Sequence, residues 1–210
     1  MRCTIFANGE YGELGAYRNI SQKGDLILCA DGGANYAYAL GLVPACILGD
    51  LDSIKPEVKK YYETRKVEFR QFSPRKDFTD LQLTLEMAEA RGADEIILLG
   101  SLGKRLDHTL ASLYSGINTV RRGIRLSHYS PACRVYIVNR EIVIEGQPGD
   151  IVSVFSLTDE AHGVKEVGFE YTANSVLENN KPYAISNVLV GRQGIIGVQS
   201  GILVVFHYTR

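Results

Sequence analysis

Two aspartates separated by one residue are the first feature of the sequence that could carry out chemistry. Asp50 and Asp52 follow the apolar run CILG (46–49). In an extended chain this spacing places both carboxylates on one side, and uncompensated carboxylates repel each other unless a cation intervenes. Hard divalent cations such as Mg²⁺ prefer oxygen ligands of this kind. The pair is therefore a candidate metal site, although taken alone it fits better a solvated turn in which Ser53 caps the next helix.

A glycine-containing cluster follows another apolar run. The segment DGGAN (31–35) comes directly after LILCA (26–30). Its glycines let backbone N–H groups approach a ligand at a helix start, where the helix dipole favours anions. A tight turn in which Asp31 caps the helix explains the same residues equally well.

The third cluster, KDFTD (76–80), combines a cation with two carboxylates. Thr79 and Gln82 have the spacing of a capping box, which predicts that a helix begins here. A cap does not require Lys76, Asp77 and Asp80 together, whereas a metal–phosphate site would use all three.

The fourth cluster, GSLGKRLDH (100–108), is a glycine-containing loop with two cations. Backbone amides and Arg105 suit phosphate oxygens, although the loop matches neither a Walker A motif nor GxGxxG. Alternatively, Asp107 caps the following helix and His108 lies on its surface. The three other histidines are solitary, and we expect His128, His162 and His207 at surface or sheet-edge positions.

All four clusters stand where predicted strands end. Up to about residue 125 the chain alternates apolar runs with helical patterns, which predicts a parallel sheet covered by helices. The expected strands are 26–30, 46–49, 67–72 and 96–100. In the last helix of this half, Leu106, Leu110, Leu113 and Ile117 recur at helical spacing. Because ligands of open α/β sheets bind at the carboxyl ends of strands, the joint pattern indicates a metal–nucleotide site whose reaction the residues alone leave open.

From about residue 133 the helical period disappears and short strands alternate with turns. This pattern predicts an antiparallel β domain of sandwich type. The run GILVVFHY (201–208) is apolar on both faces, so one face is expected to meet another subunit. We expect an α/β domain over residues 1–132 and a β domain over residues 133–210.

Composition restricts the class of protein. The chain has 210 residues, 45% hydrophobic and 22% charged, with a net charge of −1. That balance is ordinary for a globular protein and argues against a nucleic-acid partner. No apolar run approaches the ~20 residues of a membrane helix, and no secretion signal is seen. We therefore expect a cytoplasmic protein with reduced core thiols at Cys3, Cys29, Cys46 and Cys133.

Taken in order, the motifs resemble those of the thiamine pyrophosphokinase family. The matching strings are DGGAN (31–35), LGDLDSI (48–54), KDFTD (76–80) and GKRLDH (103–108), with ISN (185–187) and GILVVF (201–206) near the end. Lys104 departs from the family pattern, which usually has a second glycine there, and Val188 stands where an acidic residue is common.

The resemblance implies an N-terminal Rossmann-like α/β domain, a C-terminal β-sandwich, and a homodimer with active sites between subunits. It implies transfer of a pyrophosphoryl group from ATP to thiamine, with Mg²⁺ on Asp50, Asp52 and Asp80 and with Asp77 close by. The residues expected to bind ATP and substrate are Asn8, Gly9, Asp31, Gly32, Asn35, Lys76, Thr79, Arg105, Asp107 and His108. Those expected to bind thiamine are Tyr171, Ser186 and Asn187.

Three other interpretations remain open. The acidic loops would equally suit another Mg²⁺-dependent phosphotransferase or a nucleotide hydrolase. A dimeric nucleotide-sensing protein would bind Mg²⁺-ATP without turnover, although many carboxylates would then oppose a polyanion. An NAD-dependent oxidoreductase is disfavoured because no glycine fingerprint follows the first strand.

Overall fold

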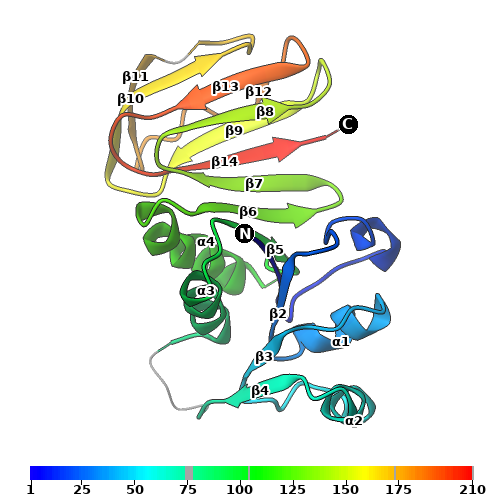
Figure 1. Ribbon diagram of the computed structural model, residues 1–210. Helices are drawn as coiled ribbons and strands as arrows, with labels where there is room; N and C mark the ends of the chain where they lie inside the picture. The colour runs from blue at the N-terminus through cyan, green and yellow to red at the C-terminus, as the bar shows by residue number, and fades with distance from the viewer. Residues whose placement is uncertain (74–77, 104, 173, 210) are drawn as a thin grey trace. The chain divides into compact units, whose positions relative to one another are not determined.

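The computed structural model describes residues 1–73, 78–103, 105–172 and 174–209. The chain is a mixed α/β protein with a large sheet of parallel and antiparallel pairs and a second, four-stranded antiparallel sheet. It divides into two compact units (Figure 1). The first contains Met1–Ser115 and His128–Pro131, and the second contains Gly116–Ser127 and the chain from Ala132 onward. The predicted boundary near residue 132 stays a prediction.

The first unit is built on parallel strands, as the alternating pattern predicted. Its strand order is β5-β1-β2-β3-β4, and every neighbouring pair is parallel. The strands are β1 (Arg2–Phe6), β2 (Leu26–Ala30), β3 (Cys46–Gly49), β4 (Glu68–Gln71) and β5 (Glu95–Leu99). All four residues of β3 are buried, which is why this strand reads as a continuous apolar run. Asp50 directly follows β3 and so lies at the carboxyl ends of the parallel strands.

Helices connect these strands. They are η1 (Leu14–Tyr17), a 3₁₀ helix, and the α-helices α1 (Gly33–Ala39), α2 (Pro56–Thr64), α3 (Asp80–Ala90) and α4 (Leu106–Arg121). The predicted cap of α3 is confirmed, since the Thr79 side chain accepts a hydrogen bond from the Gln82 amide at 3.2 Å. Ser53 does not cap α2; Lys55 occupies the cap position without a side-chain bond.

Helix α4 forms where the leucine spacing predicted it, but the leucine stripe is not uniformly buried. Leu113 is 5% exposed, whereas Leu106 and Leu110 are 77% and 55% exposed. The buried face also contains Gly116 and Thr119. Helical spacing thus predicted the helix correctly, while its buried face is rotated from the one that the stripe suggests.

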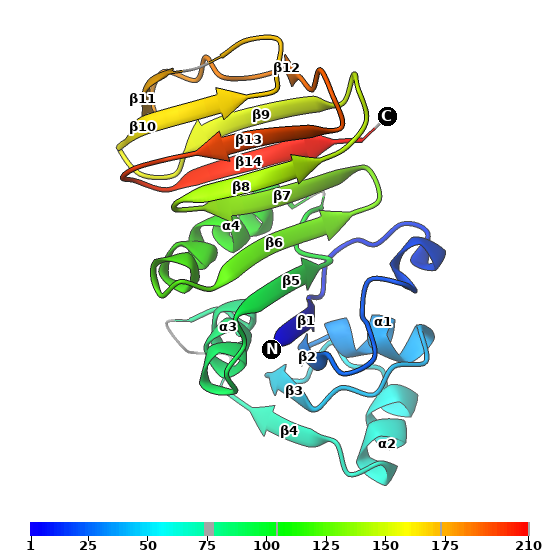
Figure 2. The same ribbon diagram turned by 45° about the horizontal axis from the view of Figure 1, so that its top comes forward.

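The second unit contains the antiparallel strands of the large sheet and the whole four-stranded sheet (Figure 2). One has the order β12-β9-β14-β7 and the other the order β11-β10-β13-β8. The strands are β7 (Cys133–Val138), β8 (Glu141–Glu145), β9 (Ile151–Ser156), β10 (Glu160–Val167), β11 (Asn174–Glu178), β12 (Asn187–Val188), β13 (Gln193–Gly197) and β14 (Leu203–Tyr208). Strand β6 (Arg125–Ser130) has residues in both units. Side chains of both sheets share one hydrophobic core, which includes Val154 and Leu203 from the first sheet and Val164 and Ile196 from the second.

Strand β14 buries one of its two apolar faces completely and the other only in part. Leu203 and Val205 are fully buried, and Val204, on the opposite face, is only 3% exposed. Farther along that second face, Phe206 is half-buried and Tyr208 is 45% exposed. The described chain therefore leaves part of this face uncovered, and its contact with a second subunit stays a prediction.

Two of the three solitary histidines are also placed differently from the prediction. His128 and His207 are buried, at 0% and 1% exposure, whereas the half-exposed side chain of His162 pairs with Glu160 at 2.9 Å. His207 is buried because Asp150 satisfies its Nε2 at 2.9 Å. The cysteine prediction is confirmed: all four are free and buried. In the described part of the chain, no helix has the length and apolarity needed to cross a bilayer.

Candidate active site

A cavity of about 930 Å³ lies in the first unit, at the carboxyl ends of its strands. It is lined by residues that follow β1, β2, β3 and β5, and by the beginnings of α3 and α4. Of the predicted site residues it contains Asn8, Gly9, Asp31, Asp50, Asp52, Thr79, Asp80, Arg105, Asp107 and His108. The predicted convergence of these motifs is therefore observed. Lys76 and Asp77 lie outside the described residues.

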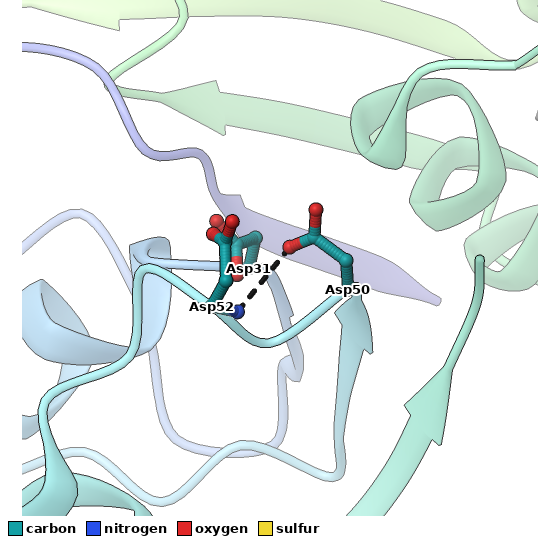
Figure 3. Close-up of side chains that lie close together, drawn as sticks. All are labelled: Asp31, Asp50 and Asp52. Carbon is teal, nitrogen blue, oxygen red and sulfur yellow. Dashed lines mark hydrogen bonds between the residues drawn. The ribbon is translucent and has the colours of Figure 1, made fainter. Parts of the chain in front are cut away.

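Three carboxylates gather within this cavity. One oxygen each of Asp31, Asp50 and Asp52 lies within 4.8 Å of the others, and the three side chains lie close together (Figure 3). Asp31 is buried, Asp50 half-buried and Asp52 exposed. Within the described residues, no lysine or arginine is ion-paired to any of them. Asp80, the third metal ligand implied by the resemblance, lines the same cavity but is not in this group.

Backbone geometry brings Asp50 and Asp52 together in a way that strand periodicity did not anticipate. Leu51 has φ 68° and Asp31 has φ 46°, values in the left-handed region that non-glycine residues rarely adopt. The Asp52 amide donates to Asp50 Oδ1 at 3.3 Å, and Ser53 Oγ donates to Asp52 Oδ1 at 2.9 Å. The two carboxylates thus approach each other through a turn and not along an extended strand. Such strained positions cluster at functional sites.

Asp31 is the least solvated member of the group. Burial raises the pKa of its carboxyl, and the charges of Asp50 and Asp80 act in the same direction, while hydrogen bonds from Gly32 and Ser53 oppose the shift. Its Oδ1 atom is buried and has no hydrogen-bond partner. A buried carboxylate oxygen without a partner is costly, and a divalent cation held by all three carboxylates would satisfy it. The donor set, made only of oxygens, fits Mg²⁺.

Close contacts with neighbouring loops explain two of the glycines in the motifs. A Cβ atom on Gly9 would lie 2.0 Å from the Gly100 carbonyl oxygen, and one on Gly32 would lie 2.3 Å from Asn8 Oδ1. The loops after β1, β2 and β5 are therefore in direct contact. A larger residue at Gly9 would have to move the backbone after β5, whereas one at Gly32 would have to displace the Asn8 side chain.

Asn35 has a positioning role in the described structure. Its Nδ2 donates to the Ser53 carbonyl at 2.9 Å, and its Oδ1 accepts from the Lys55 amide at 3.0 Å. These bonds join α1 to the loop after β3, which carries Asp50 and Asp52. Asn35 and Gly32 are not among the described residues that line the cavity.

At the other side of the cavity Arg105 and Asp107 form an exposed ion pair. Arg105 Nε donates to Asp107 Oδ1 at 2.9 Å, and this contact holds the pKa of Asp107 well below its usual range. His108 is exposed on the first turn of α4. Because the pair is solvated, Arg105 can exchange its carboxylate partner for a phosphate oxygen at little cost.

Ser101 and His128 were not predicted as site residues. Ser101 lines the cavity, and its Oγ lies 2.8 Å from His128 Nδ1. Burial lowers the pKa of His128 to about 3, so the imidazole is neutral and fixes the Ser101 hydroxyl. The alternation of Leu126 and His128, both buried in β6, is the sequence signal that could have revealed this inward-facing histidine.

The residues expected to bind thiamine lie together in the second unit. The Tyr171 amide donates to Asn187 Oδ1 at 3.1 Å. Tyr171 is 70% exposed, whereas Asn187 is 5% exposed. Ser186 is exposed, has φ 57°, and its amide donates to Ser153 Oγ at 2.9 Å. The structure therefore brings all three residues to one place.

Comparison with known proteins identifies the family. The family model described as the catalytic domain of thiamin pyrophosphokinase matches residues 17–128, which is more than half of the chain. The thiamine pyrophosphokinase of Bacillus subtilis (strain 168) is 25% identical over 209 residues, covering 98% of this chain and 97% of that protein. Thiamine pyrophosphokinase 1 of Oryza sativa subsp. japonica is 33% identical over 147 residues, covering 57% of this chain and 54% of that protein.

Solved structures agree with this match. The crystal structure of thiamine pyrophosphokinase from Bacillus subtilis superposes with a TM-score of 0.86 at 25% identity, over all of both chains. That of thiamin pyrophosphokinase from Geobacillus thermodenitrificans has the same TM-score at 21% identity, with 100% of this chain and 98% of that chain covered; this likeness shows the fold. With the motifs, the cavity and these matches taken together, the chain belongs to the thiamin pyrophosphokinase family.

Proposed function

We propose that this protein transfers the pyrophosphoryl group of ATP to the hydroxyl of thiamine, giving thiamine pyrophosphate and AMP. The observation that carries the proposal is the group of Asp31, Asp50 and Asp52 in the cavity of the first unit. These residues fall within the segment that matches the family's catalytic domain, 17–128. A nucleotide triphosphate needs such a site, because a divalent cation must offset its charge.

Mg²⁺ would be held by Asp31, Asp50 and Asp52, whose oxygens form the compact group. Bound there, the ion would supply positive charge to neutralise the phosphates of ATP. Asp80 lines the same cavity, and it remains a candidate either as a further ligand, as the resemblance implies, or as a base. Asp77 is the alternative for the base.

The loops would position the triphosphate. Backbone amides near Gly9, Gly32 and Gly103, with Lys76 and Arg105, would hold phosphate oxygens. The thiamine hydroxyl attacks the β-phosphorus, the bond from this phosphorus to the α,β-bridging oxygen breaks, and AMP leaves. Asp80 or Asp77 accepts the hydroxyl proton. Catalysis of this type depends mainly on positioning and electrostatic stabilisation.

Thiamine would be bound by the second unit, in the α/β and β-sandwich arrangement that the resemblance implies. The exposed ring of Tyr171 suits stacking on a cationic heterocycle, and Ser186 and Asn187 belong to the same site through the bond of Asn187 to Tyr171. We further propose a cytoplasmic homodimer whose active sites lie between subunits.

A product assay tests the proposal. The protein is incubated with Mg²⁺, ATP and thiamine, and AMP and thiamine pyrophosphate are separated by chromatography. We expect both products in equal amounts, with none after chelation of the metal. Release of ADP or AMP without thiamine would instead indicate a nucleotide hydrolase, and ATP binding without any turnover would indicate a sensing protein. Either result contradicts the proposal.

A further inference from the structure

The hydrogen bonds of Asn187 are all used within the chain. A side-chain amide has two donor and two acceptor positions. Asn187 Nδ2 donates to Glu166 Oε2 and to the Tyr171 carbonyl, both at 2.7 Å. Asn187 Oδ1 accepts from the amides of Tyr171 at 3.1 Å and Val188 at 3.0 Å. This side chain therefore has no position left for a substrate.

Glu166 is one of the groups that fix the orientation of the Asn187 amide. It lies in β10 at 1% exposure, and its Oε2 accepts from Asn187 Nδ2. A carboxylate oxygen accepts hydrogen bonds, so the opposite orientation of the amide would place Asn187 Oδ1 against it and against the Tyr171 carbonyl. Glu166 Oε1 is buried without a partner, so this carboxylate is retained at a cost in stability. A cost of this kind is expected where a group serves function.

Asn187 is attached to two residues whose side chains are exposed, Tyr171 through hydrogen bonds and Ser186 through the chain. Asn187 bonds both the amide and the carbonyl of Tyr171, and the Tyr171 ring is 70% exposed. The residues next to Tyr171 and Asn187 are also bonded, because the Glu170 amide donates to the Val188 carbonyl at 2.9 Å. Ser186 directly precedes Asn187, is exposed, and has the left-handed φ of 57°. A non-glycine residue keeps this conformation only when its surroundings impose it.

We propose that Glu166 and Asn187 form a buried clamp that positions Tyr171 and Ser186 for thiamine, and that Asn187 itself does not contact the substrate. The inference rests on the proposed function, because it assigns different roles to residues of the same thiamine site. Glu166 acts through Asn187 and is a positioning residue.

Amide hydrogen exchange in the ligand-free protein tests the clamp directly. In Glu166→Met the acceptor is lost at similar side-chain length, and in Glu166→Gln an acceptor oxygen is kept. We expect the Tyr171 amide to exchange about tenfold faster in Glu166→Met, the equivalent of one lost buried hydrogen bond. Glu166→Gln should stay within about twofold of the parent. Ser156→Ala is the matched control, because it removes a part-buried bond of the same unit, to the Thr158 carbonyl, without touching the clamp.

Kinetics then separate positioning from general damage. The KM for thiamine should rise about tenfold in Glu166→Met with the KM for ATP unchanged, and Glu166→Gln should restore it. The proposed clamp is wrong if the Tyr171 amide exchanges at an unchanged rate in Glu166→Met. It is also wrong if Glu166→Gln raises the KM for thiamine as much as Glu166→Met does.

One measurement on the parent protein covers the case in which Glu166→Met does not fold. The Asn187 side-chain amide protons must exchange slowly before thiamine is added, and rapid exchange overturns the proposal. If the parent makes no thiamine pyrophosphate, the proposed function fails, while the exchange data still decide whether the clamp exists.

Discussion

Asp31 in the cavity of the first unit and Asn187 in the second unit are both buried, but their hydrogen-bonding atoms are satisfied differently. Asp31, Asp50 and Asp52 lie close together, and Asp31 Oδ1 has no partner. Asn187 is equally buried, yet its four hydrogen-bonding positions are all filled by neighbouring residues. The difference shows that a residue of a family motif can either contact the ligand or hold in place the loop that contacts the ligand. A count of which hydrogen-bonding positions are already filled within the chain distinguishes these two roles.

The largest effect is expected from the cavity carboxylates. Asp50→Asn or Asp52→Asn should lower kcat/KM about 10³-fold, since several kcal/mol of transition-state stabilisation depend on a ligand of the metal. The melting temperature should change little, because both side chains reach solvent. Steady-state kinetics and thermal unfolding measure the two quantities. Activity within a few-fold of the parent would remove the mutated residue from the metal site.

Asn187→Ala should have the opposite profile. The variant loses four hydrogen bonds and leaves buried groups such as Glu166 Oε2 without this partner. The unfolding free energy should therefore fall by about 3 kcal/mol. The KM for thiamine should rise more than the KM for ATP. The companion Ser186→Ala removes an exposed hydroxyl and should leave the unfolding free energy within about 0.5 kcal/mol. Equal effects of Asn187→Ala on both KM values would contradict its assignment to the thiamine end.

Asp31→Asn should separate stability from metal binding. Replacing the buried carboxylate by a neutral amide removes its repulsion with Asp50 and Asp80 and should stabilise the metal-free protein by about 1 kcal/mol. The same change should abolish most of the stabilisation that Mg²⁺ gives the parent, which is about 1.4 kcal/mol at tenfold excess over Kd. Denaturant unfolding with and without Mg²⁺ measures both. The idea fails if the variant responds to Mg²⁺ as the parent does.

The smallest effect is expected from the exposed pair of Arg105 and Asp107. Arg105→Gln should raise the KM for ATP by about fivefold at low ionic strength, and by less in high salt, because solvated charges are screened. The melting temperature should not move, since an exposed ion pair contributes little. An equal rise of the thiamine KM would argue against contact of Arg105 with phosphate.

Much of the fold could be read from local patterns. The apolar runs predicted β2, β3 and β5 because buried parallel strands are apolar on both faces. The more polar run 67–72 predicted β4, whose residues are half-buried or exposed, and Thr79 with Gln82 predicted the start of α3. Helix α4 was predicted from its period, but its buried face was not, since Leu106 and Leu110 are exposed. Which side of a helix is covered depends on distant segments that no local pattern contains.

The sequence by itself determined which residue types reach the sheet edge: an acidic or glycine-containing loop after each strand of the first half. Only the tertiary structure decided which of them share a site. Asp31 joins Asp50 because β2 and β3 pair with Ala30 opposite Leu48, and Leu51 turns Asp52 toward them through a left-handed φ. Likewise, Glu166 meets Asn187 across 21 residues of chain. Spacing along a chain fixes local direction, whereas contacts between remote segments depend on strand register and on the packing of the whole core.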